Sequence, residues 1–379
     1  MTTAAYLDFC ATTPVDPRVA AVVRHHMEDE FGNAGSRTHE YGLTASRAVE
    51  AARAHLAAAC DARPDEVVFT SGATEANNLA LIGLAPHAHE CGRRHMLALA
   101  IEHKAVLDPL DSVAKSHGIN VELVPVGQRG WVDPEEIERR LRPDTIAVST
   151  MHANNETGVV QPLDEIASVL GDHSAYWHVD AAQTYGKVNG LDNKRIDLIS
   201  MSGHKLYAPM GVGALIARRR GYVRPPLSPL MYGGGQERGL RPGTVPVPLV
   251  VGMGEACRLA TTERARRAAA CQAHRTEVTD ALSPLSPRFN GDQDKTLPHV
   301  LNVSIPGLDA EAAMMLLRDL VAISNGSACT SSTYEPSHVL VAMGFSPERT
   351  QGALRVSWSH EPVGIDWSAV AQRLSDALR

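Results

Sequence analysis

The sequence lacks the features that mark membrane and secreted proteins. No stretch approaches the ~20 consecutive apolar residues that a membrane-spanning helix needs. The six cysteines are scattered over 379 residues without CxxC spacing, which favours a reducing compartment over a disulfide framework. The first residues lack the basic and then apolar build of a signal peptide. We therefore expect a cytoplasmic protein that does not contact a membrane.

The sequence also lacks an excess of positive charge. The net charge of −7 argues against a general nucleic-acid-binding surface. The basic run at 218–220 has no interleaved aromatic residues, so a solvated loop is favoured over a nucleic-acid site. The tract at 87–91 contains two histidines and a cysteine but no second ligand pair at finger-like spacing. We expect it to be a solvated helix end, and no metal site.

Lysine occurs only six times, and Lys205 stands out among the six. The apolar run 196–202 predicts a core strand that breaks into Ser-Gly-His-Lys. Burial lowers the pKa of a lysine toward the neutral amine that forms Schiff bases. Another apolar run, 176–180, ends in Asp180. A lysine and a carboxylate at two strand ends suit pyridoxal phosphate (PLP), because the carboxylate keeps the ring nitrogen protonated. The same two stretches fit equally well a surface lysine and a helix-capping aspartate that are not in contact in the folded protein.

A candidate phosphate site lies at the start of a predicted helix. The strand 66–70 runs into Ser-Gly-Ala-Thr and then into a helical pattern of leucines. Backbone N–H groups and the hydroxyl of Thr74 would point to one spot, where the helix dipole favours an anion. The alternative is an ordinary strand-to-helix turn with a threonine cap.

Strands and helices alternate through the first two thirds of the chain. The pattern predicts strands at 95–101, 119–126 and 145–151, with helices at 106–117 and 163–170. This alternation indicates a parallel sheet covered on both faces, which binds ligands beyond the carboxyl ends of its strands. A long helix over 246–281 is expected to lead to a second domain. Its predicted elements are strands near 288 and at 300–305 and helices at 309–320 and 365–378.

Two later residues are candidates for chemistry. Cys329 lies among serines, glycine and threonines in a predicted loop, an exposed setting that suits a nucleophile, although an incidental loop cysteine fits as well. Cys60 and Cys257 lie in apolar helical patterns and are expected to be structural. Arg355 lies inside an apolar strand and needs an anionic partner, which is either a substrate carboxylate or a structural ion pair.

Nine stretches in order resemble the cysteine desulfurases of the NifS and IscS type, which are aminotransferase-like PLP enzymes. They are YLDFCATTPVD, FGNAGSRTHEYG, SGATEANN, EHKA, HANNETGVVQ, HVDAAQ, SGHKLYAPMGVGAL, GGGQERGLRPGT and SNGSACTSS. The subtype that the chain most resembles is DndA, the desulfurase of DNA phosphorothioation systems. The resemblance implies an α/β protein of PLP-dependent transferase fold type I. Its large domain, 15–260, would hold a mainly parallel seven-stranded sheet, and 1–14 with 261–379 would form a smaller α/β domain carrying the catalytic cysteine loop.

The resemblance also implies roles for individual residues. Lys205 would hold PLP, Asp180 would meet the ring nitrogen, and His103 would stack on the ring and move protons. Cys329 would accept the sulfur. Gln183 would contact the ring oxygen, and Asn155 and Arg355 would bind the substrate carboxylate. The phosphate would be bound by Ala73, Thr74, Ser202 and His204, and by Thr244 from a second subunit.

The implied reaction converts L-cysteine to L-alanine and leaves a persulfide on Cys329. A homodimer and a protein sulfur acceptor are expected, in DNA phosphorothioation or in iron–sulfur or tRNA thiolation pathways, without direct nucleic-acid binding. Three features depart from the family. Cys10 stands where serine is usual, and Asn325 replaces a serine. The chain also ends at Arg379 without the C-terminal extension with which IscS-type members bind the iron–sulfur scaffold protein, and this puts a role in general iron–sulfur supply in doubt. The alternatives are another PLP enzyme, such as a selenocysteine lyase or an aminotransferase, and a non-catalytic partner protein.

Overall fold

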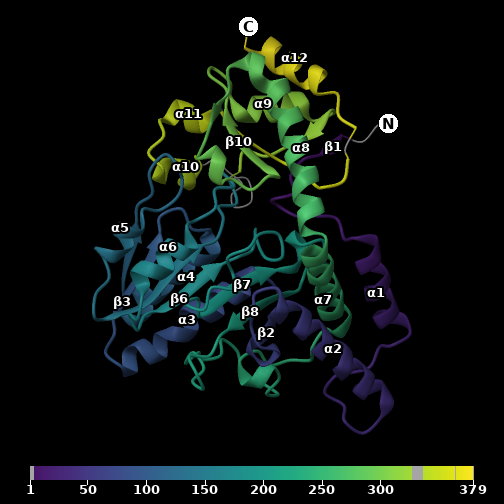
Figure 1. Ribbon diagram of the computed structural model, residues 1–379, viewed down its shortest axis with the longest axis vertical. Coiled ribbons are helices and arrows are strands. Elements are labelled where there is room, and N and C mark those ends of the chain that lie inside the picture. The colour runs from purple at the N-terminus through teal and green to yellow at the C-terminus, as the bar shows by residue number, and fades with distance from the viewer. Residues whose placement is uncertain (1–3, 327–335, 363, 379) are drawn as a thin grey trace.

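A seven-stranded sheet forms the centre of the larger part of the molecule (Figure 1). The computed structural model describes residues 4–326, 336–362 and 364–378. Within this sheet β8 alone runs antiparallel to its neighbours, which confirms the mainly parallel sheet that was predicted. The strands in spatial order are β2 (Val67–Thr70), β8 (Gly213–Ala217), β7 (Leu198–Ser202), β6 (Tyr176–Asp180), β5 (Thr145–Met151), β3 (His95–Leu99) and β4 (Asn120–Val124).

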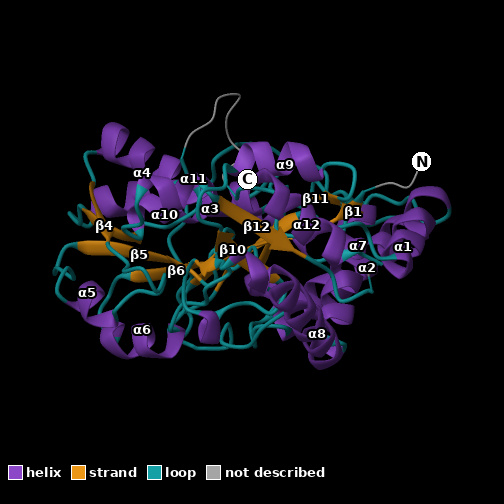
Figure 2. Ribbon diagram, turned by 90° about the horizontal axis from the view of Figure 1, so that it is seen from above, coloured by secondary structure: helices purple, strands orange, loops and turns teal. Residues whose placement is uncertain are grey.

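Helices cover both faces of this sheet (Figure 2). In β3, Met96 and Ala98 join the hydrophobic cluster under α3 (Ala73–Glu90) and α4 (Lys104–His117). Leu97 joins the cluster on the opposite face. Burial on both faces explains why the strands read as unbroken apolar runs. The helices of the opposite face are α1 (Pro17–Glu28), α2 (Glu40–Ala58), α5 (Pro134–Glu138), α6 (Leu163–Leu170) and α7 (Val247–Thr262).

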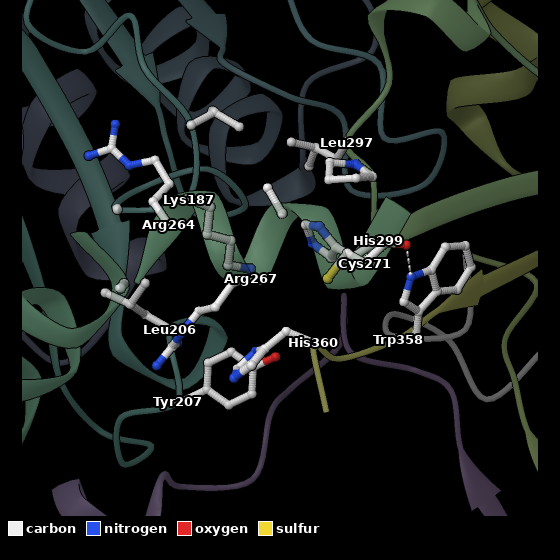
Figure 3. A pocket seen from close by; sticks show the side chains of 15 residues that line it. Lys187, Leu206, Tyr207, Arg264, Arg267, Cys271, Leu297, His299, Trp358 and His360 are labelled. Atoms are coloured by element: carbon white, nitrogen blue, oxygen red, sulfur yellow. Dashed lines mark hydrogen bonds between the residues drawn. The ribbon is translucent and has the colours of Figure 1, made fainter. Parts of the chain in front are cut away.

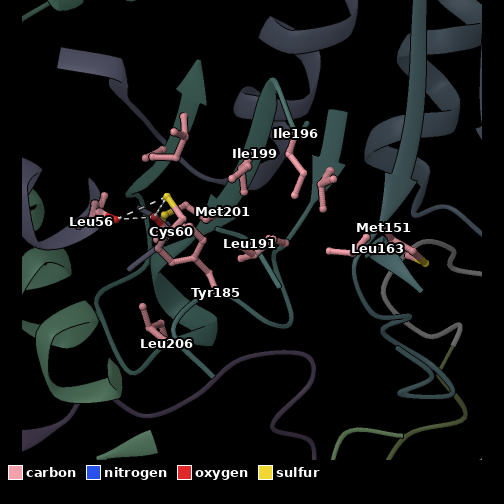
Figure 4. Packing of buried hydrophobic residues seen from close by; sticks show 14 of the residues in the cluster. Leu56, Cys60, Met151, Leu163, Tyr185, Leu191, Ile196, Ile199, Met201 and Leu206 are labelled. Carbon is pink, nitrogen blue, oxygen red and sulfur yellow. Dashed lines mark hydrogen bonds between the residues drawn. The ribbon is translucent and has the colours of Figure 1, made fainter. Parts of the chain in front are cut away.

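The larger hydrophobic cluster connects α2 to β7 and to the turn after β6 (Figure 4). The hydroxyl of Tyr185 donates a hydrogen bond of 2.6 Å to the carbonyl of Leu56 and also contacts Cys60. Cys60 and Cys257 are fully buried, and burial raises the pKa of both thiols, that of Cys257 to about 12. Both cysteines are structural, as predicted.

The smaller part of the molecule is built on an antiparallel sheet in the order β12-β10-β9. The N-terminal segment joins it, because β1 (Ala5–Tyr6) pairs with β11 (Val321–Ala322) and Leu7 packs in the cluster of this part. The domain limits at 14 and 260 stay a prediction. The remaining elements are β9 (Arg288–Phe289), β10 (Val300–Ser304), β12 (Ala353–Ser357), α8 (Arg264–Leu282), α9 (Ala310–Leu317), α10 (His338–Ala342), α11 (Pro347–Gln351) and α12 (Trp367–Ala377).

The helix predicted over 246–281 is two helices, so this expectation was wrong in detail. Glu263 separates α7 from α8, with φ −103° and ψ 7°. Its carboxylate accepts hydrogen bonds from Arg18 at 2.6 Å and from Arg267 at 2.9 Å. The two helices still run on from one part of the molecule to the other (Figure 1). Because both helices keep a buried face, the apolar pattern gave no signal for the break.

The basic run after β8 is the expected solvated loop only in part, because Arg220 is exposed whereas Arg218 is buried. Arg218 is 5% exposed, and its guanidinium donates to the main-chain carbonyl of Asn193 at 2.6 Å. Arg220 forms an ion pair of 2.6 Å with the buried Asp197. These arginines tie the end of β8 to the loop before β7. Among the described helices, none is long and apolar enough to cross a membrane.

Gly254 tests the packing of α7 on α2. A Cβ added to Gly254 would lie 2.6 Å from both Cα and Cβ of Ala52. Alanine is favoured over glycine inside a helix by ~1 kcal/mol, so any loss must come from this close approach. We expect Gly254→Ala to lower the free energy of unfolding by about 1–3 kcal/mol in urea titrations. Gly127→Ala, which meets nothing within 4 Å, is the control. Equal stability of wild type and Gly254→Ala would contradict the packing.

Candidate active site

A cavity of about 410 Å³ opens where polar side chains follow the carboxyl ends of several strands of the large sheet. Thr70 of β2 and Ser202 of β7 both lie level with Gly213 of β8, so the antiparallel strand brings their ends together. Only glycine fits at 213, because a Cβ there would lie 2.5 Å from Cα of Gly72. The turn before α3 therefore packs directly against the start of β8, which lies next to the end of β7.

Lys205 lines this cavity at the end of a short 3₁₀ helix, Gly203–Lys205, that follows β7. The backbone there is fixed by Thr13, whose N–H and hydroxyl both donate to the carbonyl of His204 at 2.9 Å. Nδ1 of His204 lies 3.1 Å from the hydroxyl of Thr12. Burial lowers the pKa of His204 to about 4, so its ring is neutral at pH 7. The amine of Lys205 is thus presented from a rigid turn.

Asp180, the last residue of β6, lies in the same cavity and is 6% exposed. Its carboxylate accepts hydrogen bonds from Nδ2 of Asn77 at 2.8 Å and from the N–H of Ala182 at 2.9 Å. In the described part of the chain no lysine or arginine forms an ion pair with it. A buried carboxylate without a cation is costly to desolvate. A protonated ring nitrogen would supply the missing positive partner.

The first turn of α3 forms another wall of the cavity through Ala73 and Thr74. The helix has 18 residues and begins after Gly72, and no side chain caps its N-terminus. Its first N–H groups therefore point toward the cavity with the positive end of the helix dipole behind them. This geometry fits a phosphate group.

His103 caps α4 and lines the opposite side of the cavity. Nδ1 accepts a hydrogen bond of 3.0 Å from the N–H of Ala105, so the neutral ring carries its proton on Nε2. Burial, followed by the charge of Lys205, lowers the pKa of His103. The ring is therefore a neutral proton carrier beside the lysine.

Gln183 presents an unsatisfied group to the site. Nε2 donates to the carbonyl of Cys10 at 3.0 Å, whereas the buried Oε1 has no hydrogen-bond partner among the described residues. Buried amide atoms rarely stay unpaired, so this end of the cavity suits a polar ligand. The side chains present fit PLP at its amine, ring and phosphate ends.

The structure gathers most of the predicted site around this one cavity. The predicted residues that line it are Ala73, Thr74, His103, Asn155, Asp180, Gln183, Ser202, His204 and Lys205. Thr244 is exposed and does not line it, although Arg241 of the same loop binds Glu75 at the cavity edge at 3.0 Å. Cys329 lies outside the described residues.

Arg355 lies behind the cavity. It is 1% exposed, and its guanidinium forms an ion pair of 2.6 Å with Asp8 and donates to the carbonyl of Asn155 at 3.0 Å. The sequence left two partners open for Arg355, a substrate carboxylate and a structural ion pair, and the structure contains the ion pair. Since Asn155 itself lines the cavity, Arg355 holds it in place.

Asn77 was missed as a residue of the site, and Glu102, which precedes His103, was given no role. Asn77, the partner of Asp180, lies one turn into α3, and its place next to the predicted phosphate site was a usable signal. Glu102 is fully buried, accepts from the N–H of Met151 at 2.5 Å and leaves Oε2 unpaired among the described residues. Burial, together with the charge of Asp180, raises the pKa of Glu102 well above its usual range. Within the described ranges, no group of three or more His, Cys, Asp or Glu side chains could hold a metal ion.

Known proteins similar to this chain include several cysteine desulfurases. The cysteine desulfurase IscS of Vibrio cholerae is 44% identical over 357 residues, which is 93% of this chain and 87% of that protein. The mitochondrial cysteine desulfurase of Saccharomyces cerevisiae is 42% identical over 380 residues, which is 99% of this chain and 75% of that protein.

Solved structures agree with these relatives. The crystal structure of DndA from Streptomyces lividans is 50% identical with a TM-score of 0.82, and the match covers 95% of this chain and 99% of that chain. A structure of SspA in complex with cysteine is 35% identical with a TM-score of 0.83, covering 95% and 100%. The family model for aminotransferase class-V matches residues 5–361. The chain therefore belongs to the class-V aminotransferases, a family of PLP-dependent enzymes.

Proposed function

We propose that this protein is a cysteine desulfurase, which converts L-cysteine to L-alanine and retains the sulfur as an enzyme persulfide. The observation that carries the proposal is the meeting of Lys205, Asp180 and His103 in one cavity that fits PLP. The cysteine desulfurase relatives and the cysteine-bound SspA support the substrate. When bound, PLP would hold the substrate amine and withdraw electrons from its α-carbon.

The side chains divide the remaining work. Asp180 would keep the ring nitrogen protonated, and the amine of Lys205 would hold the cofactor. His103 holds a proton on Nε2 where the substrate would lie. Asn155 orients the substrate carboxylate, with Arg355 behind it.

The sulfur transfer itself is assigned to Cys329. Its thiolate attacks the substrate sulfur, the bond between that sulfur and the β-carbon breaks, and the β-carbon takes up a proton to give alanine. The sulfur remains bonded to Cys329 as a persulfide. A thiol in a loop, as the sequence predicts for Cys329, suits this role, because the persulfide must afterwards meet an acceptor.

A pair of variants separates cofactor binding from sulfur transfer. Lys205→Ala is expected to lose the yellow colour of the bound cofactor and all turnover. Cys329→Ser should keep the colour but lose persulfide formation and at least about 100-fold of the alanine produced from L-cysteine, because it lacks the accepting thiol. Absorbance spectra, a persulfide stain and an alanine assay measure these effects.

Cys91→Ser, an exposed cysteine remote from the cavity lining, is the matched control and should behave as wild type. Wild-type turnover by Cys329→Ser would assign the role to another thiol, with Cys10 the next to test. A borohydride-reducible link to the cofactor in Lys205→Ala would overturn the lysine assignment.

We also propose that the enzyme is a homodimer in which Thr244 of one subunit reaches the phosphate of the other. Large side chains are exposed at the cavity and in the glycine-rich loop, which favours an interface. Met210, 65% exposed, lines the cavity itself, and Tyr232 in the glycine-rich loop is 89% exposed.

Thr244→Ala is expected to increase the dissociation constant for PLP about five- to tenfold, because one charge-assisted hydrogen bond to the phosphate is lost. Dialysis followed by cofactor absorbance measures this loss, and Thr262→Ala, an exposed threonine of α7, is the control. An active, PLP-saturated monomer in sedimentation would exclude the dimeric site.

For the acceptor we propose a cytoplasmic protein of a DNA phosphorothioation system. The likeness to DndA supports this pathway, and the net charge of −7 argues against a general surface for holding DNA directly. Direct binding would require clustered lysine and arginine and would fall steeply with salt.

The acceptor is tested with radiolabelled L-cysteine at physiological salt. Label should pass from the loaded enzyme to the DNA-modification acceptor and not to DNA alone. An iron–sulfur scaffold protein serves as the competing acceptor. Efficient transfer to that scaffold, with none to the DNA-modification protein, would overturn the proposal.

A further inference from the structure

A second cavity lies between the two parts of the molecule, apart from the one that contains Lys205 (Figure 3). The larger part contributes Lys187 and Leu206, and the smaller part contributes Leu297 and His299 on the approach to β10. Cys271 of α8 lines the side between them. The space open to the centre of a water molecule is about 50 Å³, enough for several waters or one small organic molecule.

The charge in this cavity is not balanced. No aspartate or glutamate is among the described residues that line it. Arg267 is already paired with Glu263 at 2.9 Å, and Arg264 donates to the side chain of Asn189. The ammonium of Lys187 has no hydrogen bond and no ion pair in the described part of the chain. Figure 3 shows its side chain reaching toward Arg267 and Cys271.

His299 supplies a second unsatisfied group. It is 8% exposed, and its Nε2 has no hydrogen-bond partner among the described residues. Burial, followed by the charge of Lys187, lowers its pKa well below the usual range, so the ring is neutral and retains one N–H donor. Much of the remaining lining is apolar, from Leu206, Leu297 and Trp358.

We propose that this cavity is a binding site for a small monocarboxylate, whose anionic group pairs with Lys187 and whose short hydrocarbon part lies on Leu206 and Leu297. A carboxylate supplies the charge that the lysine lacks, and the apolar lining excludes a highly hydrated inorganic anion. Amino acids are rejected, because their ammonium group would face Lys187 and Arg267. The ligand would contact both parts of the molecule at once.

Binding is expected to depend on pH through Lys187. Burial lowers the pKa of its ammonium to about 8, so it is charged at pH 7 and loses its charge as the pH rises through 8. A bound anion stabilises the charged form, so affinity should fall about tenfold from pH 7 to pH 9. The titratable or charged groups around this ammonium are Cys10, His204, Lys205, Arg267, Cys271 and His299. The thiol of Cys271, with its pKa raised to about 11, stays neutral over this range.

The test is a titration of the PLP-loaded enzyme with propionate, followed by ligand NMR at pH 7 and pH 9. We expect Lys187→Met to weaken propionate binding about ten- to hundredfold, the loss of one charge-assisted contact. Lys187→Arg, which keeps the charge, should retain most of it. Lys194→Met is the matched control, because Lys194 is exposed and paired with Asp61 on the surface.

Asn155→Ala distinguishes binding at this site from binding in the cavity of Lys205. Propionate that binds beside Lys187 should keep its affinity in this variant. Circular dichroism and the melting temperature establish that each variant is folded. Equal propionate affinity in wild type and Lys187→Met, or no propionate binding to wild type, would each overturn the proposal.

Discussion

The buried carboxylate of Asp180 is the constraint on which the cofactor site depends. A carboxylate that is 6% exposed costs several kcal/mol to desolvate. Among the described residues, two hydrogen bonds, from Asn77 and from the N–H of Ala182, offset this cost. The fold can hold it because β6 ends at Asp180 while α3 presents Asn77 from across the cavity. The negative charge of Asp180 that these hydrogen bonds leave uncompensated favours a ligand with a cationic ring nitrogen.

The smaller part of the molecule completes this site from behind. Arg355 of β12 forms an ion pair with Asp8 and donates a hydrogen bond to the carbonyl of Asn155. An ion pair between the N-terminal and C-terminal segments therefore supports Asn155 in the cavity wall. Gln183 is joined to Cys10 in the same way. The N-terminal segment therefore connects both sheets, and displacement of either one would change the shape of the cavity.

Local patterns predicted the sheet and the ends of its strands. Unbroken apolar runs followed by polar residues located Asp180 and Lys205, because parallel strands release the chain at one edge of the sheet. The break at Glu263 could not be predicted, since the apolar face continues through both helices. Nor could the burial of Arg218, whose partners are main-chain carbonyls far along the chain, with no sequence signature.

The sequence by itself determined the residue types at the strand ends, the family resemblance and the uncommon lysines. Tertiary structure alone decided which of these residues meet. Asn77 of α3 meets Asp180 of β6 where the turn before α3 packs against Gly213 of β8, and Arg355 meets Asp8 because the N-terminal segment joins the smaller sheet. Lys187 was an ordinary residue in the sequence. Cationic and apolar side chains surround it at the junction of the two parts of the molecule. The pKa of a side chain depends on its neighbours in space, and the order of residues along the chain does not reveal these neighbours.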